Sequence, residues 1–151
     1  MQAGKICQRL VFTIEANDEV THAAQLMREK HVGYLVVAEP DLVGQCVRPV
    51  GVLTDRDIVI TVVAREVDPK TLKVRDIMTP NPVTIDEAES METALQKMRE
   101  FGIRRLPVID RNGALMGILA ADDILCVLAA DTEDMVTAAR TQRRVEGARR
   151  T

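Results

Sequence analysis

The side chains that could take part in catalysis are few. The only histidines, His22 and His31, fall in one predicted helix, so a histidine-based metal site or a Ser-His-Asp triad has few possible members. The cysteines Cys7, Cys46 and Cys126 lie far apart and form no C-x-x-C pair, which argues against disulfide and zinc frameworks. We therefore expect no enzymatic activity, no catalytic residue and no metal site.

Two polar groupings remain. Thr54 and Asp57 stand three residues apart where a strand is expected to meet a helix. An ionised carboxylate only accepts hydrogen bonds and a threonine can donate or accept, so this pair can hold a ligand. The same spacing is also that of a capping box, and both roles can coexist. Arg104 and Arg105 are adjacent; their planar guanidinium groups match phosphate oxygens, or else they are solvated charges at the end of a strand.

Length and composition narrow the class of protein. With 151 residues, 46% hydrophobic and 28% charged, the chain is typical of a compact folded protein. The net charge of -3 does not single out nucleic acid or an anionic membrane as a partner. The longest uncharged apolar runs are far shorter than the roughly 18 residues of a membrane span, so no membrane association is expected. The first residues contain no apolar segment behind a basic start, from which we expect a cytoplasmic setting.

The sequence repeats itself. Residues 4–37 match residues 75–108 at one constant offset, with Met27 equivalent to Met98 and Leu35 to Leu106. Residues 50–64 match residues 116–130 in the same way. Each repeat is predicted to run strand, helix, strand, strand, helix. The methionines lie on the apolar stripe of the first helix of each repeat and are interpreted as core residues.

The predicted strands and helices determine where these polar residues lie. One strand-to-helix junction falls at residues 54–57 and its equivalent at residues 120–123. A repeat of this size is too small to bury a good core alone, so the two repeats should pack together. The predicted fold class is α+β, with two β-α-β-β-α repeats about a pseudo-twofold axis and clefts at their junction. The expected divisions are residues 1–66, 67–130, and a C-terminal helical basic tail at 131–151.

Three motifs, in this order and duplicated, resemble a known family. They are GVLTDRDI at 51–58, VRDIMTP at 74–80 leading into PVTI at 82–85, and RRLPV at 104–108. Together they resemble a tandem pair of CBS domains, named after cystathionine β-synthase and also called a Bateman module. The resemblance implies a non-enzymatic regulatory module that binds an adenosine-containing ligand, AMP, ADP or ATP, with S-adenosylmethionine less favoured. It also implies a disc-shaped homodimer that signals to an effector protein.

The resemblance assigns residues to two clefts. In the first cleft, Thr54 and Asp57 would share a ligand with Thr84, Arg104 and Arg105. The carboxylate would accept from the ribose hydroxyls, and the arginines would hold a phosphate.

The second cleft departs from the family pattern. Its candidates are Asp123, Thr13 and Tyr34, but Ala120 stands where the family has Thr or Ser, and Gly33 and Tyr34 replace basic residues. Tyr34 either stacks on an adenine or fills the core. The expectation is therefore one strong nucleotide site per chain.

Two rival functions stay open, one suggested by the C-terminal tail and one by the altered second cleft. From residue 138 onward the basic residues outnumber Glu146, the single acid; they are Arg140, Arg143, Arg144, Arg149 and Arg150. Such a tail suits a solvated helix end, although it could instead serve a nucleic-acid-associated regulator. The other alternative is a structural dimerisation module that binds no ligand. Nucleic acid is the less favoured partner.

Overall fold

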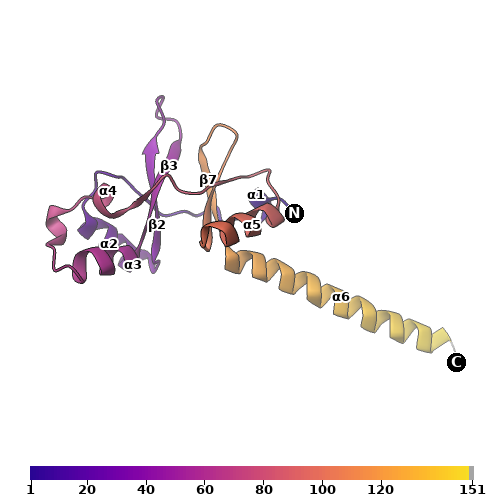
Figure 1. Cartoon of the computed structure of the whole chain (residues 1–151). Helices are drawn as coiled ribbons and strands as arrows, with labels where there is room; N and C mark the ends of the chain where they lie inside the picture. The colour runs from indigo at the N-terminus through magenta and orange to yellow at the C-terminus, as the bar shows by residue number, and fades with distance from the viewer. Residues whose placement is uncertain (150–151) are drawn as a thin grey trace.

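Two small sheets form the centre of the molecule (Figure 1). In the computed structural model, which describes residues 1–149, the first sheet has the order β1-β2-β3-β4 and the second the order β5-β6-β7. Their strands are β1 (Thr13–Ile14), β2 (Tyr34–Pro40), β3 (Val47–Thr54), β4 (Thr79–Pro80), β5 (Ile85–Asp86), β6 (Arg105–Ile109) and β7 (Leu115–Ala120). In both sheets the first strand is parallel to the second, and the second is antiparallel to the third.

Helices complete each repeat. They are α1 (Ala3–Ile6), α2 (Val20–Lys30), α3 (Asp55–Ile58) with its π-helical continuation Val59–Val63, the 3-10 helix Pro69–Thr71, α4 (Val74–Ile77), α5 (Met91–Phe101) and α6 (Ala121–Arg149). The predicted α+β class, the repeated β-α-β-β-α order and the C-terminal helix are confirmed. Residues 150 and 151 of the predicted tail lie outside the described residues.

The equivalent helices α2 and α5 form for the reasons the sequence indicated. Each buries its apolar stripe, including Met27 in α2 and Met98 in α5. Ser90 caps the start of α5 by accepting a hydrogen bond from the backbone N–H of Thr93 at 3.2 Å. The helix ends at Gly102, whose φ of 64° is the left-handed conformation that favours glycine.

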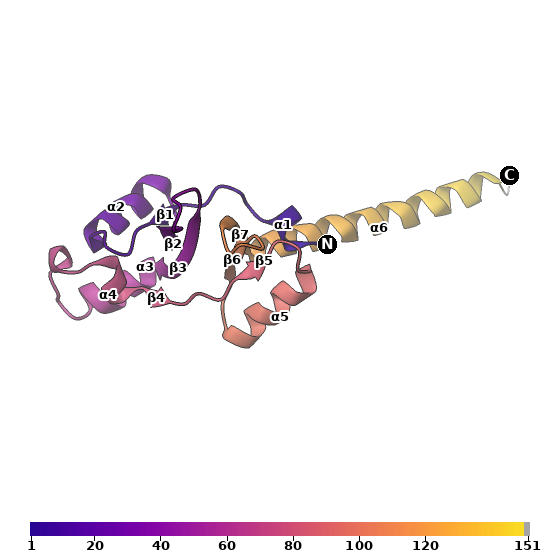
Figure 2. The same cartoon turned by 90° about the horizontal axis from the view of Figure 1, so that it is seen from above.

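Each repeat completes its core with a short helix from the N-terminal start of the other repeat. Ala3 of α1 is fully buried against the second sheet, with Leu106 and Leu119. Val74 of α4 is fully buried in the first core with Leu35. The segment from α1 to β1 and the segment from β4 to β5 each run from one repeat to the other (Figure 2). Neither repeat therefore has a complete core on its own. The boundaries at 66/67 and 130/131 stay a prediction.

The last helix leaves the body of the molecule. Helix α6 begins directly after β7, packs through Ile124 into the second core, and then extends away from both sheets (Figures 1 and 2). No Gly or Pro separates the part belonging to the repeat from residues 131–149, so one helix runs through both. Within residues 1–149, no helix combines the length and the apolar character that crossing a bilayer requires.

Candidate functional site

The first cleft is a cavity of about 530 Å³ between the two repeats. Four stretches of chain form its walls: the start of β2, the β3–α3 junction, the segment from β4 to Val83, and the segment from Gly102 into β6. Four of the five predicted residues line it: Thr54, Asp57, Arg104 and Arg105. The fold therefore brings together residues that are about fifty positions apart in sequence.

Thr54 and Asp57 form the capping box anticipated from their spacing. The Thr54 hydroxyl accepts from the backbone N–H of Asp57 at 3.2 Å, and Asp57 Oδ2 accepts from the N–H of Thr54 at 2.9 Å. Among the described residues Asp57 has no other hydrogen-bond partner, so Oδ1 retains its capacity to accept. The capping box fixes the carboxylate in position, and it leaves one oxygen available to a ligand.

Three arginines bring positive charge to the first cleft. Arg56, Arg104 and Arg105 all line the first cleft. Arg104 Nη2 donates to Asp122 Oδ1 at 2.9 Å, but the two side chains are 76% and 68% exposed. An ion pair this exposed contributes at most about 1 kcal/mol. A bound phosphate can therefore replace Asp122 as the partner of Arg104 at little cost.

Arg105 and Tyr34 separate the two clefts. The guanidinium carbon of Arg105 lies 5.4 Å from the centre of the Tyr34 ring, which is cation–π geometry. Both residues line both clefts. They occupy equivalent positions in the two repeats, so their contact lies where the repeats meet. Burial raises the pKa of the Tyr34 phenol far above its usual value, so the ring stays neutral.

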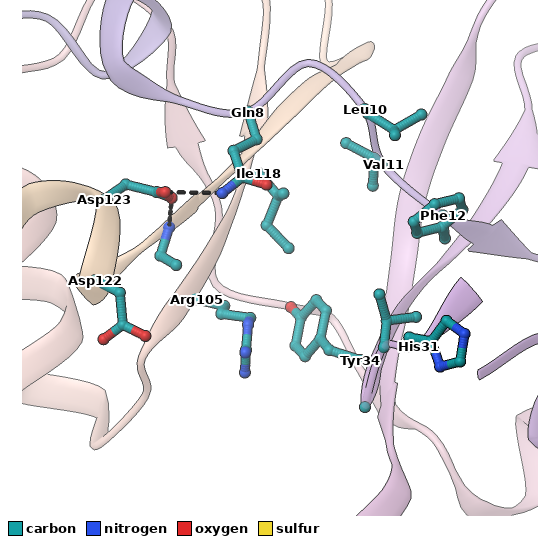
Figure 3. A pocket seen from close by; sticks show the side chains of 13 residues that line it. Gln8, Leu10, Val11, Phe12, His31, Tyr34, Arg105, Ile118, Asp122 and Asp123 are labelled. Atoms are coloured by element: carbon teal, nitrogen blue, oxygen red, sulfur yellow. Dashed lines mark hydrogen bonds between the residues drawn. The ribbon is translucent and has the colours of Figure 1, made fainter. Parts of the chain in front are cut away.

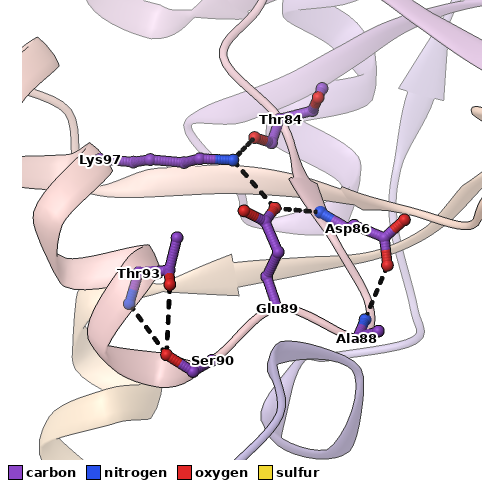
Figure 4. A network of polar contacts seen from close by, with 7 residues as sticks. All are labelled: Thr84, Asp86, Ala88, Glu89, Ser90, Thr93 and Lys97. Atoms are coloured by element: carbon purple, nitrogen blue, oxygen red, sulfur yellow. Dashed lines mark hydrogen bonds and ion pairs between the residues drawn. The ribbon is translucent and has the colours of Figure 1, made fainter.

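Thr84 lies beside the first cleft and is not one of the residues that line it. Its backbone carbonyl accepts a hydrogen bond from Lys97 Nζ at 3.0 Å (Figure 4). The same ammonium group pairs with Glu89 Oε2 at 2.9 Å, and that oxygen also accepts from the N–H of Asp86. The network fixes the chain next to Val83, which does line the cavity. A contact between the Thr84 side chain and a ligand stays a prediction.

The second cleft is smaller, about 310 Å³, and its carboxylate is occupied (Figure 3). Asp123 Oδ1 accepts from Gln8 Nε2 at 2.8 Å, and Oδ2 accepts from the N–H of Ala120 at 2.8 Å. Asp123 and Tyr34 line this cavity, whereas Thr13 is exposed and is not among its lining residues. In contrast to Asp57, Asp123 therefore has a protein partner on each oxygen.

Sequence reasoning missed Gln8 and Arg56. Arg56 sits inside the Thr54–Asp57 spacing, so its place in the first cleft could have been inferred from that junction. Gln8 had no such signal, because it reaches Asp123 across 115 positions of sequence. Only the crossing of the N-terminal segment onto the second sheet brings the two together.

Comparisons with known proteins agree with the fold. The CBS domain family matches residues 3–64 and 74–130. An uncharacterized protein of Methanopyrus kandleri, MK0525, is 35% identical over 127 residues, which cover 84% of this chain and 62% of that protein.

Two solved structures are also similar. A putative signal-transduction protein with CBS domains from Burkholderia ambifaria is 30% identical, with a TM-score of 0.74 and coverage of 87% of this chain and 96% of that one. A CBS domain protein from Pyrobaculum aerophilum, solved in complex with AMP, is 26% identical, with a TM-score of 0.72 and coverage of 86% and 99%.

Proposed function

The chain belongs to the CBS domain family, and from this premise we propose that it senses an adenine nucleotide, AMP, ADP or ATP, bound in the first cleft. The observation that carries the proposal is the pairing of a held carboxylate, Asp57, with three arginines around one cavity. The related Pyrobaculum protein binds AMP, which supports the same class of ligand. The family match indicates a regulatory domain and no catalytic family.

Each part of a nucleotide has a suitable partner in the first cleft. Asp57 Oδ1 can accept from ribose hydroxyls, with the Thr54 hydroxyl beside it. Val52, Val83 and Ile103 supply an apolar wall for an adenine ring. The phosphates would lie among the arginines, whose guanidinium groups bind phosphate oxygens in pairs. S-adenosylmethionine is less favoured, because its sulfonium cation would meet the same positive charges.

A thermal-shift panel tests this function. AMP, ADP and ATP should raise the melting temperature of the full chain, with AMP raising it more than adenosine, because only the nucleotides engage the arginines. A ligand at 100 times its Kd adds about 2.7 kcal/mol to the free energy of unfolding, an effect that such an assay resolves easily. If none of these ligands raised the melting temperature at millimolar concentration, the module would be a structural one without a nucleotide.

An exposed apolar surface supports homodimer formation. Val59, Ile60 and Val63, on the continuation of α3, are 55%, 49% and 66% exposed. Leu95 and Phe101 of α5 add further exposed apolar side chains. Apolar patches of this kind mark association surfaces, and self-association of identical chains most often uses a twofold axis. We include in the proposal a homodimer formed through this helical face.

The dimer is tested in a chain ending at Ala130, where the family match ends. Its mass by light scattering should be that of a dimer, and Ile60→Asp with Val63→Asp should reduce it to a monomer, because buried unpaired carboxylates oppose association. Leu42→Asp is the matched control, since Leu42 is fully exposed at the tip of the β2–β3 hairpin. A monomeric parent chain, or an effect of Leu42→Asp equal to that of the pair, would contradict the assignment.

A further inference from the structure

The part of α6 from Leu128 to Glu146 projects from the body of the molecule. Every described side chain from Leu128 to Glu146 is exposed, and the helix runs away from both sheets (Figure 1). A single helix of this length is only marginally stable in water by its own hydrogen bonds. Its stability therefore calls for a surface to pack against.

One face of this segment carries a regular seam. Residues at alternating spacings of three and four fall on one side of a helix and can pack against a second helix. The seam residues are Leu128, Asp131, Met135, Ala138, Gln142 and Val145. The largest apolar members are well exposed: Leu128 by 42%, Met135 by 73% and Val145 by 42%.

The charges along the segment divide into two halves. Asp131, Glu133 and Asp134 make the first half acidic, and Arg140, Arg143 and Arg144 make the second half basic. The helix dipole does not account for this division, since its influence is confined to the first and last turns. Helix α6 begins at Ala121 and ends at Arg149, so both charge clusters lie in its interior.

We propose that this segment packs antiparallel against α6 of a second copy of the chain. In that orientation the acidic half of each helix faces the basic half of the other. A parallel pair would set acid against acid and base against base, which is unfavourable. The charge pattern thus selects both the partner and its direction.

The seam is self-complementary in the same orientation. One antiparallel register pairs Leu128 with Val145 of the second copy, and Met135 with Ala138 of the second copy, so that a large side chain meets a small one at the centre. It also sets Asp131 opposite Gln142 of the second copy. Gln142 Nε2 donates one hydrogen to Glu146 at 2.9 Å, and its other hydrogen can be donated to that Asp131.

Disulfide cross-linking tests the register. In a full-length chain with Cys7, Cys46 and Cys126 replaced by alanine, Leu128→Cys with Val145→Cys should form disulfide-linked chains under mild oxidation. The two positions are about 25 Å apart within one helix, so a bond between them must join two copies. Leu128→Cys alone is the control: it should not cross-link, because in this register the two copies of residue 128 are also about 25 Å apart. Circular dichroism confirms that each variant is folded.

Charge reversal tests the pairing itself. In the double-cysteine chain, Glu133→Arg with Asp134→Arg should weaken cross-linking by about tenfold, as should Arg140→Glu with Arg143→Glu, since each change makes the facing halves alike in charge. Mixing the two variants should restore cross-linking between them.

Three outcomes would overturn the proposal: no cross-link in the double-cysteine chain, a strong cross-link through residue 128 alone, or no recovery on mixing. Salt-dependent binding of a mixed-sequence DNA duplex that requires Arg140 and Arg143, in place of cross-linking, would instead assign the segment to nucleic acid. Neither readout involves a nucleotide, so failure here is distinct from failure of the proposed nucleotide site.

Discussion

Asp57→Ala is expected to weaken AMP binding roughly 10- to 100-fold, because a hydrogen bond to a charged group contributes about 1.5 to 3 kcal/mol. The side chain is held by the N–H of Thr54 and keeps one oxygen available inside the first cleft. Its removal takes away the acceptor proposed for the ribose hydroxyls. Titration calorimetry of the parent and the variant measures the change in Kd.

Asp123→Ala is the matched control, since it changes the equivalent residue of the other repeat. Its effect on AMP affinity should be small, because Gln8 and the N–H of Ala120 already occupy the Asp123 carboxylate. Ala120 also lacks the hydroxyl that Thr54 supplies. Equal losses from the two variants, or two equivalent sites per chain in the titration, would disprove the asymmetry between the clefts.

A loss of folding must be separated from a loss of binding. Asp57 also belongs to the capping box of α3, so Asp57→Ala removes one of its two hydrogen bonds, worth about 1 kcal/mol, as well as a ligand contact. Asp57→Asn retains an oxygen that can accept from Thr54, and it replaces the oxygen proposed for the ribose by an uncharged NH2 group that cannot accept a hydrogen bond. A reduced AMP affinity in Asp57→Asn, with an unchanged melting temperature of the ligand-free chain, would show that the loss comes from the contact with the ligand and not from folding.

Much of the fold follows from the repeat. Because Met27 and Met98 occupy equivalent positions on apolar stripes, α2 and α5, each with one buried face, and the sheets they cover could be predicted by pattern alone. The grouping of Asp57 with Arg104 at one junction between repeats came from the family resemblance. Spacing within a single repeat carries no information on which residues of the other repeat lie opposite.

What could not be predicted depends on contacts between distant segments. Helices α1 and α4 have only four residues each, too few for a periodic pattern to reveal the surface they cover. The partner of Asp123 was hidden for the same reason, since Gln8 arrives on the segment that follows α1. The difference between the clefts therefore has two sources. The alanine at position 120 could be recognised from the sequence, whereas the hydrogen bond from Gln8 to Asp123 could not.

The crossing of the N-terminal segment onto the second sheet predicts that Gly117→Ala is strongly destabilising. A Cβ atom at Gly117 would lie 2.7 Å from Cys7 Sγ and 2.7 Å from the backbone oxygen of Gln8. Gln8 and Ile118 exchange two backbone hydrogen bonds of 2.9 Å beside this point, so the segment cannot move away without breaking them. Overpacking of this kind costs about 1 to 3 kcal/mol of unfolding free energy. Chemical denaturation measures it.

Gly51→Ala is the matched control, at the equivalent position of the first repeat. There the nearest atom to the added Cβ is Met78 Sδ at 2.6 Å, in a flexible side chain, and the nearest backbone atom is Thr79 O at 3.0 Å. Because a methionine can change rotamer, Gly51→Ala should cost less than Gly117→Ala. Amide exchange at Gln8 and Ile118 should also rise in Gly117→Ala alone, as their mutual hydrogen bonds weaken. Equal denaturation midpoints for the two variants, with unchanged exchange at Gln8, would show that the N-terminal segment does not constrain β7 at Gly117.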